Sequence, residues 1–79
     1  MSYEIPLPNP ALLKEKPLDS RAVMEMLVKE GFNPIAITAD NNLGKVIVYF
    51  TEPLSSRESK KLMELVTDYY KKHVGLKKE

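Results

Sequence analysis

The stretch NPIAITADNNLGKVIVYFTE, residues 33–52, decides the fold. Two runs rich in β-branched side chains, residues 33–40 and 45–52, flank the polar NNLG of residues 41–44. Such runs on either side of a short, glycine-containing turn are typical of a β-hairpin. The second run is apolar on both faces, which is usual for a strand that is central in its sheet or covered on both sides. An antiparallel hairpin is therefore predicted here.

A helix is predicted before the hairpin, over about residues 20–30. Asp19 is a typical N-cap residue, and Gly31 can adopt the left-handed conformation that ends many helices. The apolar surface of this helix is wider than one small sheet can cover, which indicates burial on two sides. Its members are Ala22, Val23, Met24, Met26, Leu27 and Val28.

A second helix is predicted after Pro53, because proline ends strand pairing. Ser55, followed three residues later by Glu58, forms a capping box that begins the helix, and Gly75 marks its end. Apolar side chains recur at helical spacing between residues 62 and 73. Helix initiation alone explains the polar, serine-rich corner between the second strand and this helix.

The first 17 residues contain four of the six prolines. Proline fixes φ and lacks a backbone N–H, so this segment is expected to be an extended arm rather than a helix or a central strand. The arm either packs on its own domain or docks on another chain. A two-stranded hairpin also needs a third strand. That strand is either residues 2–5, added at an edge, or the hairpin edge of a second protomer.

These patterns predict one small α+β domain in which an antiparallel hairpin is packed by two helices. Residues 1–17 form the extended Pro-rich arm, residues 18–75 the α-β-β-α domain, and residues 76–79 a flexible tail. A chain of 79 residues has a single small core, and without cysteine neither disulfides nor a thiolate zinc site can reinforce it. Packing, self-association or a partner is expected to supply the reinforcement.

The composition argues against two broad classes of function. No apolar run approaches the roughly 20 residues that span a membrane, and the N-terminus lacks the basic and apolar regions of a secretory signal. A soluble, cytoplasmic protein without membrane contact is expected. The formal net charge of +1 is too small to indicate a nucleic-acid-binding protein by itself.

The sequence contains no constellation that is typical of an enzyme. Catalysis usually needs a nucleophile or an acid–base pair that converges in a pocket. The only histidine, His73, lies near a helix C-terminus, where the helix dipole favours an imidazolium. Ser55 and Ser56 follow no glycine-rich phosphate loop, and residues 40–44 lack the later ligands of a calcium loop. A non-enzymatic protein with no cofactor, metal or small-molecule substrate is expected.

Residues 46–70, VIVYFTEPLSSRESKKLMELVTDYY, combine a strand that ends in phenylalanine, a Pro-Leu corner, a serine cap and a helix with a Leu-x-x-Leu-Val core. This order of features resembles the strand-to-helix ends of small virus or phage accessory and virion-associated proteins. The resemblance implies a small non-enzymatic protein that works by assembly, such as a viral or accessory structural protein. It brings no active-site residues with it.

The resulting hypothesis is a protein-interaction or assembly module that forms a homo-oligomer or binds a protein partner. Its candidate interaction residues are Leu7, Met24, Val28, Ile47 and Tyr49. The alternative is a small nucleic-acid-binding protein that uses the basic face of the C-terminal helix for phosphate contacts, although acidic side chains interrupt that face. Its candidate contacts are Lys60, Lys61, Lys71 and Lys72.

Overall fold

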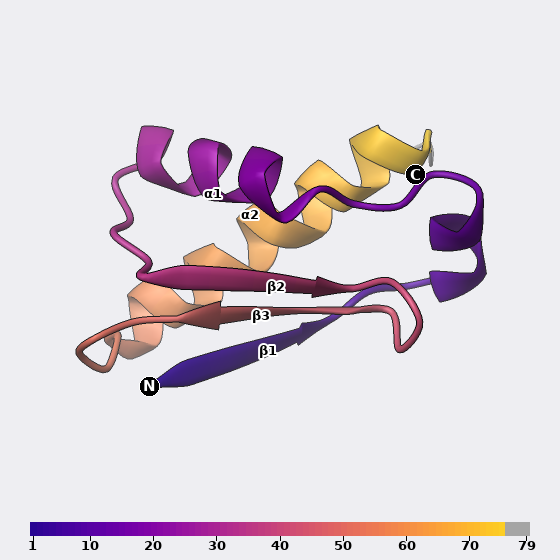
Figure 1. The fold of residues 1–79 in the computed structure, drawn as a ribbon. Helices are drawn as coiled ribbons and strands as arrows, with labels where there is room; N and C mark the ends of the chain where they lie inside the picture. Colours follow the sequence, from indigo (N-terminus) through magenta and orange to yellow (C-terminus); the bar gives the residue numbers. More distant parts are fainter. Residues whose placement is uncertain (76–79) are drawn as a thin grey trace.

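The computed structural model describes residues 1–75, and the predicted tail at residues 76–79 lies outside the described residues. The α+β class, with an antiparallel hairpin and two helices, is confirmed (Figure 1). The elements follow in the order β1 (Ser2–Pro6), a 3-10 helix η1 (Pro10–Lys14), α1 (Ser20–Lys29), β2 (Ala36–Asp40), β3 (Lys45–Tyr49) and α2 (Ser56–Val74).

β3 is the central strand of a three-stranded sheet with the order β1-β3-β2. Both neighbours run antiparallel to it, so Val48 lies between Tyr3 of β1 and Ile37 of β2. The central position agrees with the expectation from the apolar pattern of β3, although the helices cover only the face that carries Val46 and Val48.

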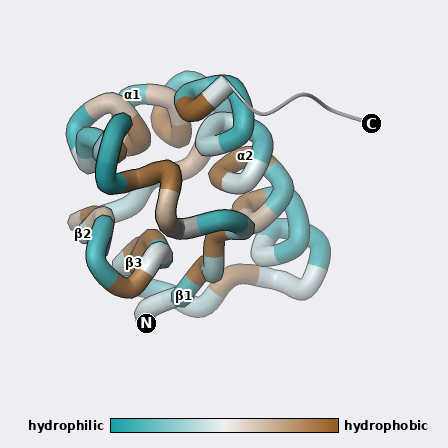
Figure 2. Tube along the Cα trace, turned by 90° about the vertical axis from the view of Figure 1, so that its right-hand side faces the viewer, coloured by the Kyte–Doolittle hydropathy of each residue, from teal (hydrophilic) through white to brown (hydrophobic). Residues whose placement is uncertain are grey.

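The molecule has two layers, a sheet and a pair of helices that both lie on one face of it. α1 packs over β2 and α2 packs over β1, as the end-on view in Figure 2 shows. The core lies between the layers, and Val46 and Val48 of β3 point into it whereas Ile47 and Tyr49 point to the opposite face. The buried side chains are Ile5, Leu7, Leu13, Leu18, Val23, Leu27, Phe32, Val46, Val48, Phe50, Leu62, Val66 and Tyr70.

The first 17 residues do not form the extended arm that was expected. Residues 2–6 form β1 at the edge of the sheet and so supply the third strand, which was one of the two arrangements left open. The chain then forms η1, which accommodates a proline at its start because the first N–H groups of a helix have no partner within it. Leu7 and Leu13 are buried in the core. The segment therefore packs on its own domain.

The helix ends follow the predicted capping signals. The carboxylate of Asp19 accepts a hydrogen bond of 3.0 Å from the N–H of Arg21 at the start of α1. Ser55 and Glu58 form a reciprocal capping box at the start of α2, and Gly75 ends that helix with a φ of 78°. These caps satisfy backbone groups that would otherwise lack partners.

Candidate interaction surface

The five predicted interaction residues lie in three different places. Leu7 is only 6% exposed, so its side chain belongs to the core and is not available on the surface. Ile47 and Tyr49 are half-buried on the face of the sheet opposite the helices. Met24 and Val28 lie on α1. The structure therefore divides the surface candidates between the open face of the sheet and one side of α1.

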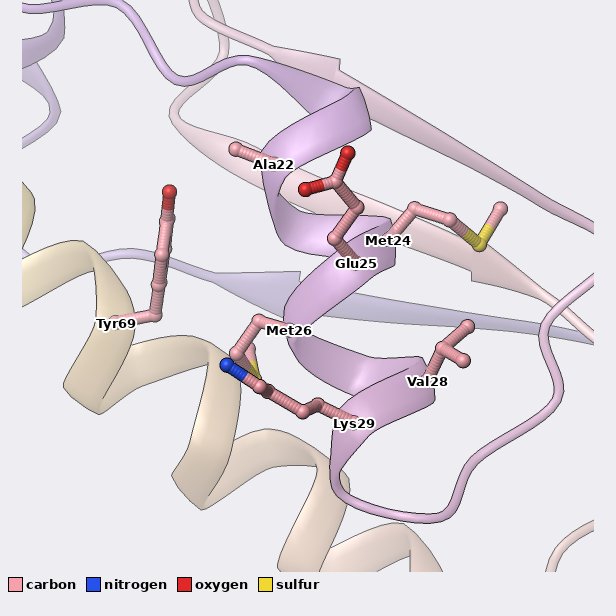
Figure 3. A pocket seen from close by; sticks show the side chains of 7 residues that line it. All are labelled: Ala22, Met24, Glu25, Met26, Val28, Lys29 and Tyr69. Atoms are coloured by element: carbon pink, nitrogen blue, oxygen red, sulfur yellow. The ribbon is translucent and has the colours of Figure 1, made fainter.

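α1 is covered on two of its sides and leaves a third apolar side exposed. Val23 and Leu27 are buried against the sheet, and Met26 points toward α2. Met24 and Val28 point to the side away from α2, as Figure 3 shows, and the side chain of Val28 is 54% exposed. We refer to Met24 and Val28 as the α1 flank.

A shallow pocket crosses the outer surface of α1 and reaches Tyr69 of α2 (Figure 3). Most of its lining is apolar, and Glu25 and Lys29, one turn apart, are its charged members. One carboxylate and one ammonium group give the pocket no net charge. The pocket offers apolar contact area with a balanced charge, which suits a contact surface better than a catalytic cleft.

The hydrogen bonds between β1 and β3 establish which way each strand directs its backbone groups. Met1 and Phe50 exchange two hydrogen bonds, of 2.8 and 2.9 Å, and the N–H of Leu7 donates to the carbonyl of Gly44 over 2.9 Å. In an antiparallel ladder the N–H and C=O of one residue point the same way, and this direction alternates along the strand. The even-numbered residues of β3 therefore face β1, and the odd-numbered residues face β2.

The outer side of β2 carries backbone groups that no described strand pairs with. The register aligns residues 36, 38 and 40 with the odd-numbered residues of β3, so these direct their backbone groups inward. Ile37 and Ala39 consequently direct their N–H and C=O groups outward. We refer to these outward groups of Ile37 and Ala39 as the β2 edge.

The outer side of β1 is different, because its outward positions carry features that block pairing. By the same alternation the outward residues are Ser2, Glu4 and Pro6. Pro6 has no N–H to donate, and Glu4 carries a charge that pairs with Lys45. Proline and charged residues are common devices that protect a sheet edge from association. The β2 edge has neither device, since both of its residues are uncharged and retain their N–H groups.

The open face of the sheet does not have the charge of a nucleic-acid platform. Tyr49 on the central strand is an aromatic side chain that could stack on a base. The charged side chains on this face are Glu4, Asp40 and Lys45, which sum to one negative charge. Glu4 raises the pKa of Lys45 through its hydrogen bond and its charge.

The four lysines proposed for nucleic-acid contact do not form one cluster. Residues 60 and 61 are exposed near the start of α2, whereas Lys71 is half-buried and Lys72 exposed near its end. Corresponding members of the two pairs are eleven positions apart, which is about 16 Å along the helix. Glu64 and Asp68 are exposed between them. The structure thus gives two short basic patches with acidic side chains in between.

His73 connects α2 to the segment before α1. Its Nε2 lies 3.0 Å from the carbonyl oxygen of Pro17, and its ring stacks on Tyr69 with centroids 6.2 Å apart. Within residues 1–75, the His, Asp and Glu side chains form no group of three or more that could hold a metal ion. The helices in this part of the chain are also too short or too polar to cross a bilayer.

Comparison with known proteins returned no protein-family model, no curated protein and no solved structure that matches the chain. The α1 flank and the β2 edge are the two surface features from which a function can be inferred. The α1 flank was predicted from the sequence because Met24 and Val28 widen the apolar surface of a helix. Pairing through a hairpin edge was one arrangement considered from the sequence, but the residues of the β2 edge were not predicted, since the outward direction of Ile37 and Ala39 depends on how β3 pairs with both of its neighbours.

Proposed function

We propose that this chain is a small, non-enzymatic protein-interaction module that works by self-association. The observation that carries the proposal is the difference between the two edges of the sheet. Pro6 and Glu4 protect the β1 side, whereas the β2 edge keeps uncharged residues with free donors and acceptors. Unprotected strand edges pair readily with another strand, and main-chain hydrogen bonds then supply the affinity.

The α1 flank supports the proposal because it lies on the same side of the molecule as the β2 edge. α1 packs over β2, and Met24 and Val28 point away from α2. A chain that paired with β2 would therefore also meet an apolar surface above the new strand pair. Burial of apolar area at about 25 cal/mol per Å² would add to the main-chain hydrogen bonds.

The size of the domain supplies a physical reason for association. A chain of 79 residues buries a smaller fraction of its surface on folding than a larger domain does, and self-association is one way in which such domains gain stability. The resemblance of residues 46–70 to virion-associated proteins agrees with an assembly role.

Sedimentation analysis over a wide concentration range tests the proposal. One chain has a mass of 9.0 kDa, and the mass in solution is expected to rise toward twice this value as the concentration increases. Circular dichroism at the lowest concentration shows whether the separated chains remain folded. A chain that stays monomeric and folded up to about 1 mM, where the dissociation free energy would be only about 4 kcal/mol, would refute self-association.

A further inference from the structure

We infer that the partner at the β2 edge is a second copy of this chain, and that the two β2 strands pair antiparallel about a two-fold axis at Thr38. This inference rests on the proposed function and specifies its interface. The two sheets would join into one with the strand order β1-β3-β2-β2-β3-β1, and both helix layers would lie on the same face.

The backbone of β2 selects this register. When Ile37 of one copy lies opposite Ala39 of the other, both residues direct their N–H and C=O groups at each other, and the symmetric pair does the same. Every outward group of the β2 edge then has a partner. If the two-fold axis lay at Ile37 or at Ala39, only the residue at the axis would pair, with the same residue of the second copy. The other outward residue would lie opposite a position that does not belong to the β2 edge.

The side chains are also compatible with this register. On the helix side, the large Ile37 would lie beside the small Ala39 of the second copy. On the open face, Thr38 would lie across from Thr38, a favourable cross-strand pair. Asp40, the charged residue of β2, would lie across from Ala36, so no two like charges would meet.

The α1 flank fits the same two-fold axis. α1 runs in the direction opposite to β2 (Figure 1), so the two copies of α1 would run antiparallel beside each other. Met24 of one copy would then face Val28 of the other. Lys29 points toward α2 (Figure 3) and therefore lies outside this contact, which the apolar side chains of Met24 and Val28 would form.

Disulfide formation at the two-fold axis gives a direct test, because the chain contains no cysteine. Thr38 faces Thr38 in a non-hydrogen-bonded pair, for which the Cα atoms of antiparallel strands lie about 4.5 Å apart, within the range that a disulfide spans. The test variant is Thr38→Cys. Ala36→Cys is the matched control, since it lies on the same face of the same strand but would be about 13 Å from its symmetry mate at 3.3 Å per residue.

Under mild oxidation at micromolar concentration, Thr38→Cys is expected to form a covalent dimer at least about tenfold faster than Ala36→Cys, because pairing raises the effective thiol concentration. Equal rates for the two variants, with a wild-type chain that dimerises, would overturn this interface and leave self-association standing. A wild-type chain that remains monomeric would remove the interface and the proposed function together.

Proline substitution provides a second, independent variant pair. Ala39→Pro removes an outward N–H, so the folded monomer is expected to persist while dimerisation is lost. Ser2→Pro makes the same change at an outward position of β1 and is expected to leave dimerisation unchanged. Sedimentation and circular dichroism report the two properties separately. A folded Ala39→Pro variant that still dimerises as the wild type does would contradict the inference.

Discussion

The buried hydroxyl of Tyr70 donates a hydrogen bond of 2.6 Å to the backbone carbonyl of Asn9. The two residues are 61 positions apart, so this contact joins α2 to the beginning of the chain. Asn9 holds the left-handed conformation, with a φ of 50°, immediately before η1. Asparagine tolerates this conformation better than most residues. The contact thus attaches to α2 the turn between β1 and η1, the short helix that places Leu13 in the core.

Tyr70→Phe should lower the free energy of unfolding by about 1–3 kcal/mol, because it removes the donor and leaves the carbonyl of Asn9 without it. The ring still fills the core, so the fold should persist. Urea unfolding measures the change. Tyr69→Phe is the matched control, since Tyr69 is half-buried and its stacking on His73 uses the ring rather than the hydroxyl. Equal effects of the two variants would show that the hydrogen bond of Tyr70 contributes nothing specific.

The same residue should make stability fall in alkaline solution. Burial raises the pKa of Tyr70 above its usual value of 10.0. A tyrosine is charged only when deprotonated, so above about pH 10 the unfolded chain releases this proton while the folded chain retains it. The stability that is linked to the protonated hydroxyl of Tyr70 is fully present below about pH 10 and is lost as the pH rises. Urea titrations at pH 8 to 11 should show a steeper decline for the wild type than for Tyr70→Phe.

Amide exchange should alternate along β1. Tyr3 and Ile5 direct their N–H groups toward β3 and should exchange slowly, whereas Ser2 and Glu4 direct theirs outward and should exchange quickly. Proton exchange followed by NMR at residue resolution measures this pattern. Uniformly fast exchange over residues 2–6 would mean that β1 is not a stable part of the sheet in solution.

The local signals in the sequence were sufficient for much of the fold. The turn at residues 41–44 and the caps at Asp19 and Ser55 act over a few residues, so the hairpin and both helices could be predicted from the sequence. β1 could only be left as one of two alternatives, because it depends on pairing with residues of β3 that lie 39 to 47 positions away in the sequence. The prolines near it suggested an arm. Pro6 is tolerated in β1 because its missing N–H lies on the outer side.

The surface was predicted only in part, for reasons that lie in the packing. Leu7 was expected on the surface, but it lies in the core beneath the helix layer because β1 belongs to the sheet. Ile47 and Tyr49 were grouped with Met24 and Val28 because all four are apolar. Ile47 and Tyr49 lie apart from Met24 and Val28 because both helices cover the same face of the sheet. Since β3 is apolar on both faces, its sequence does not indicate which face the helices cover.

Val28→Asp should weaken self-association without unfolding the domain. Val28 is 54% exposed, so the new carboxylate remains hydrated in the monomer but would be desolvated between two copies of α1. The dissociation constant should rise by at least about tenfold, which corresponds to about 1.4 kcal/mol. Met63→Asp is the matched control, because Met63 is 45% exposed on α2, away from β2. Comparable weakening by both variants would indicate that the interface lies elsewhere.

The nucleic-acid alternative has a separate test. Replacing Lys60, Lys61, Lys71 and Lys72 by glutamine should leave self-association unchanged. The wild type should bind DNA or RNA only weakly at physiological salt, because acidic side chains separate the two basic pairs. Fluorescence anisotropy at several salt concentrations measures the affinity. Sub-micromolar binding that the quadruple variant loses would favour the nucleic-acid function over assembly.

In the proposed assembly, the proline at position 6 would limit how many copies of this chain can join one sheet. A sheet with two usable edges grows by successive addition and forms a fibre, whereas one with a single usable edge stops when two copies have met. Pro6 and its neighbour Glu4 leave one such edge in each chain. If copies associate through the β2 edge as proposed, growth would therefore stop after a single step, and we expect Pro6→Val combined with Glu4→Thr to allow an open-ended polymer instead of a closed pair.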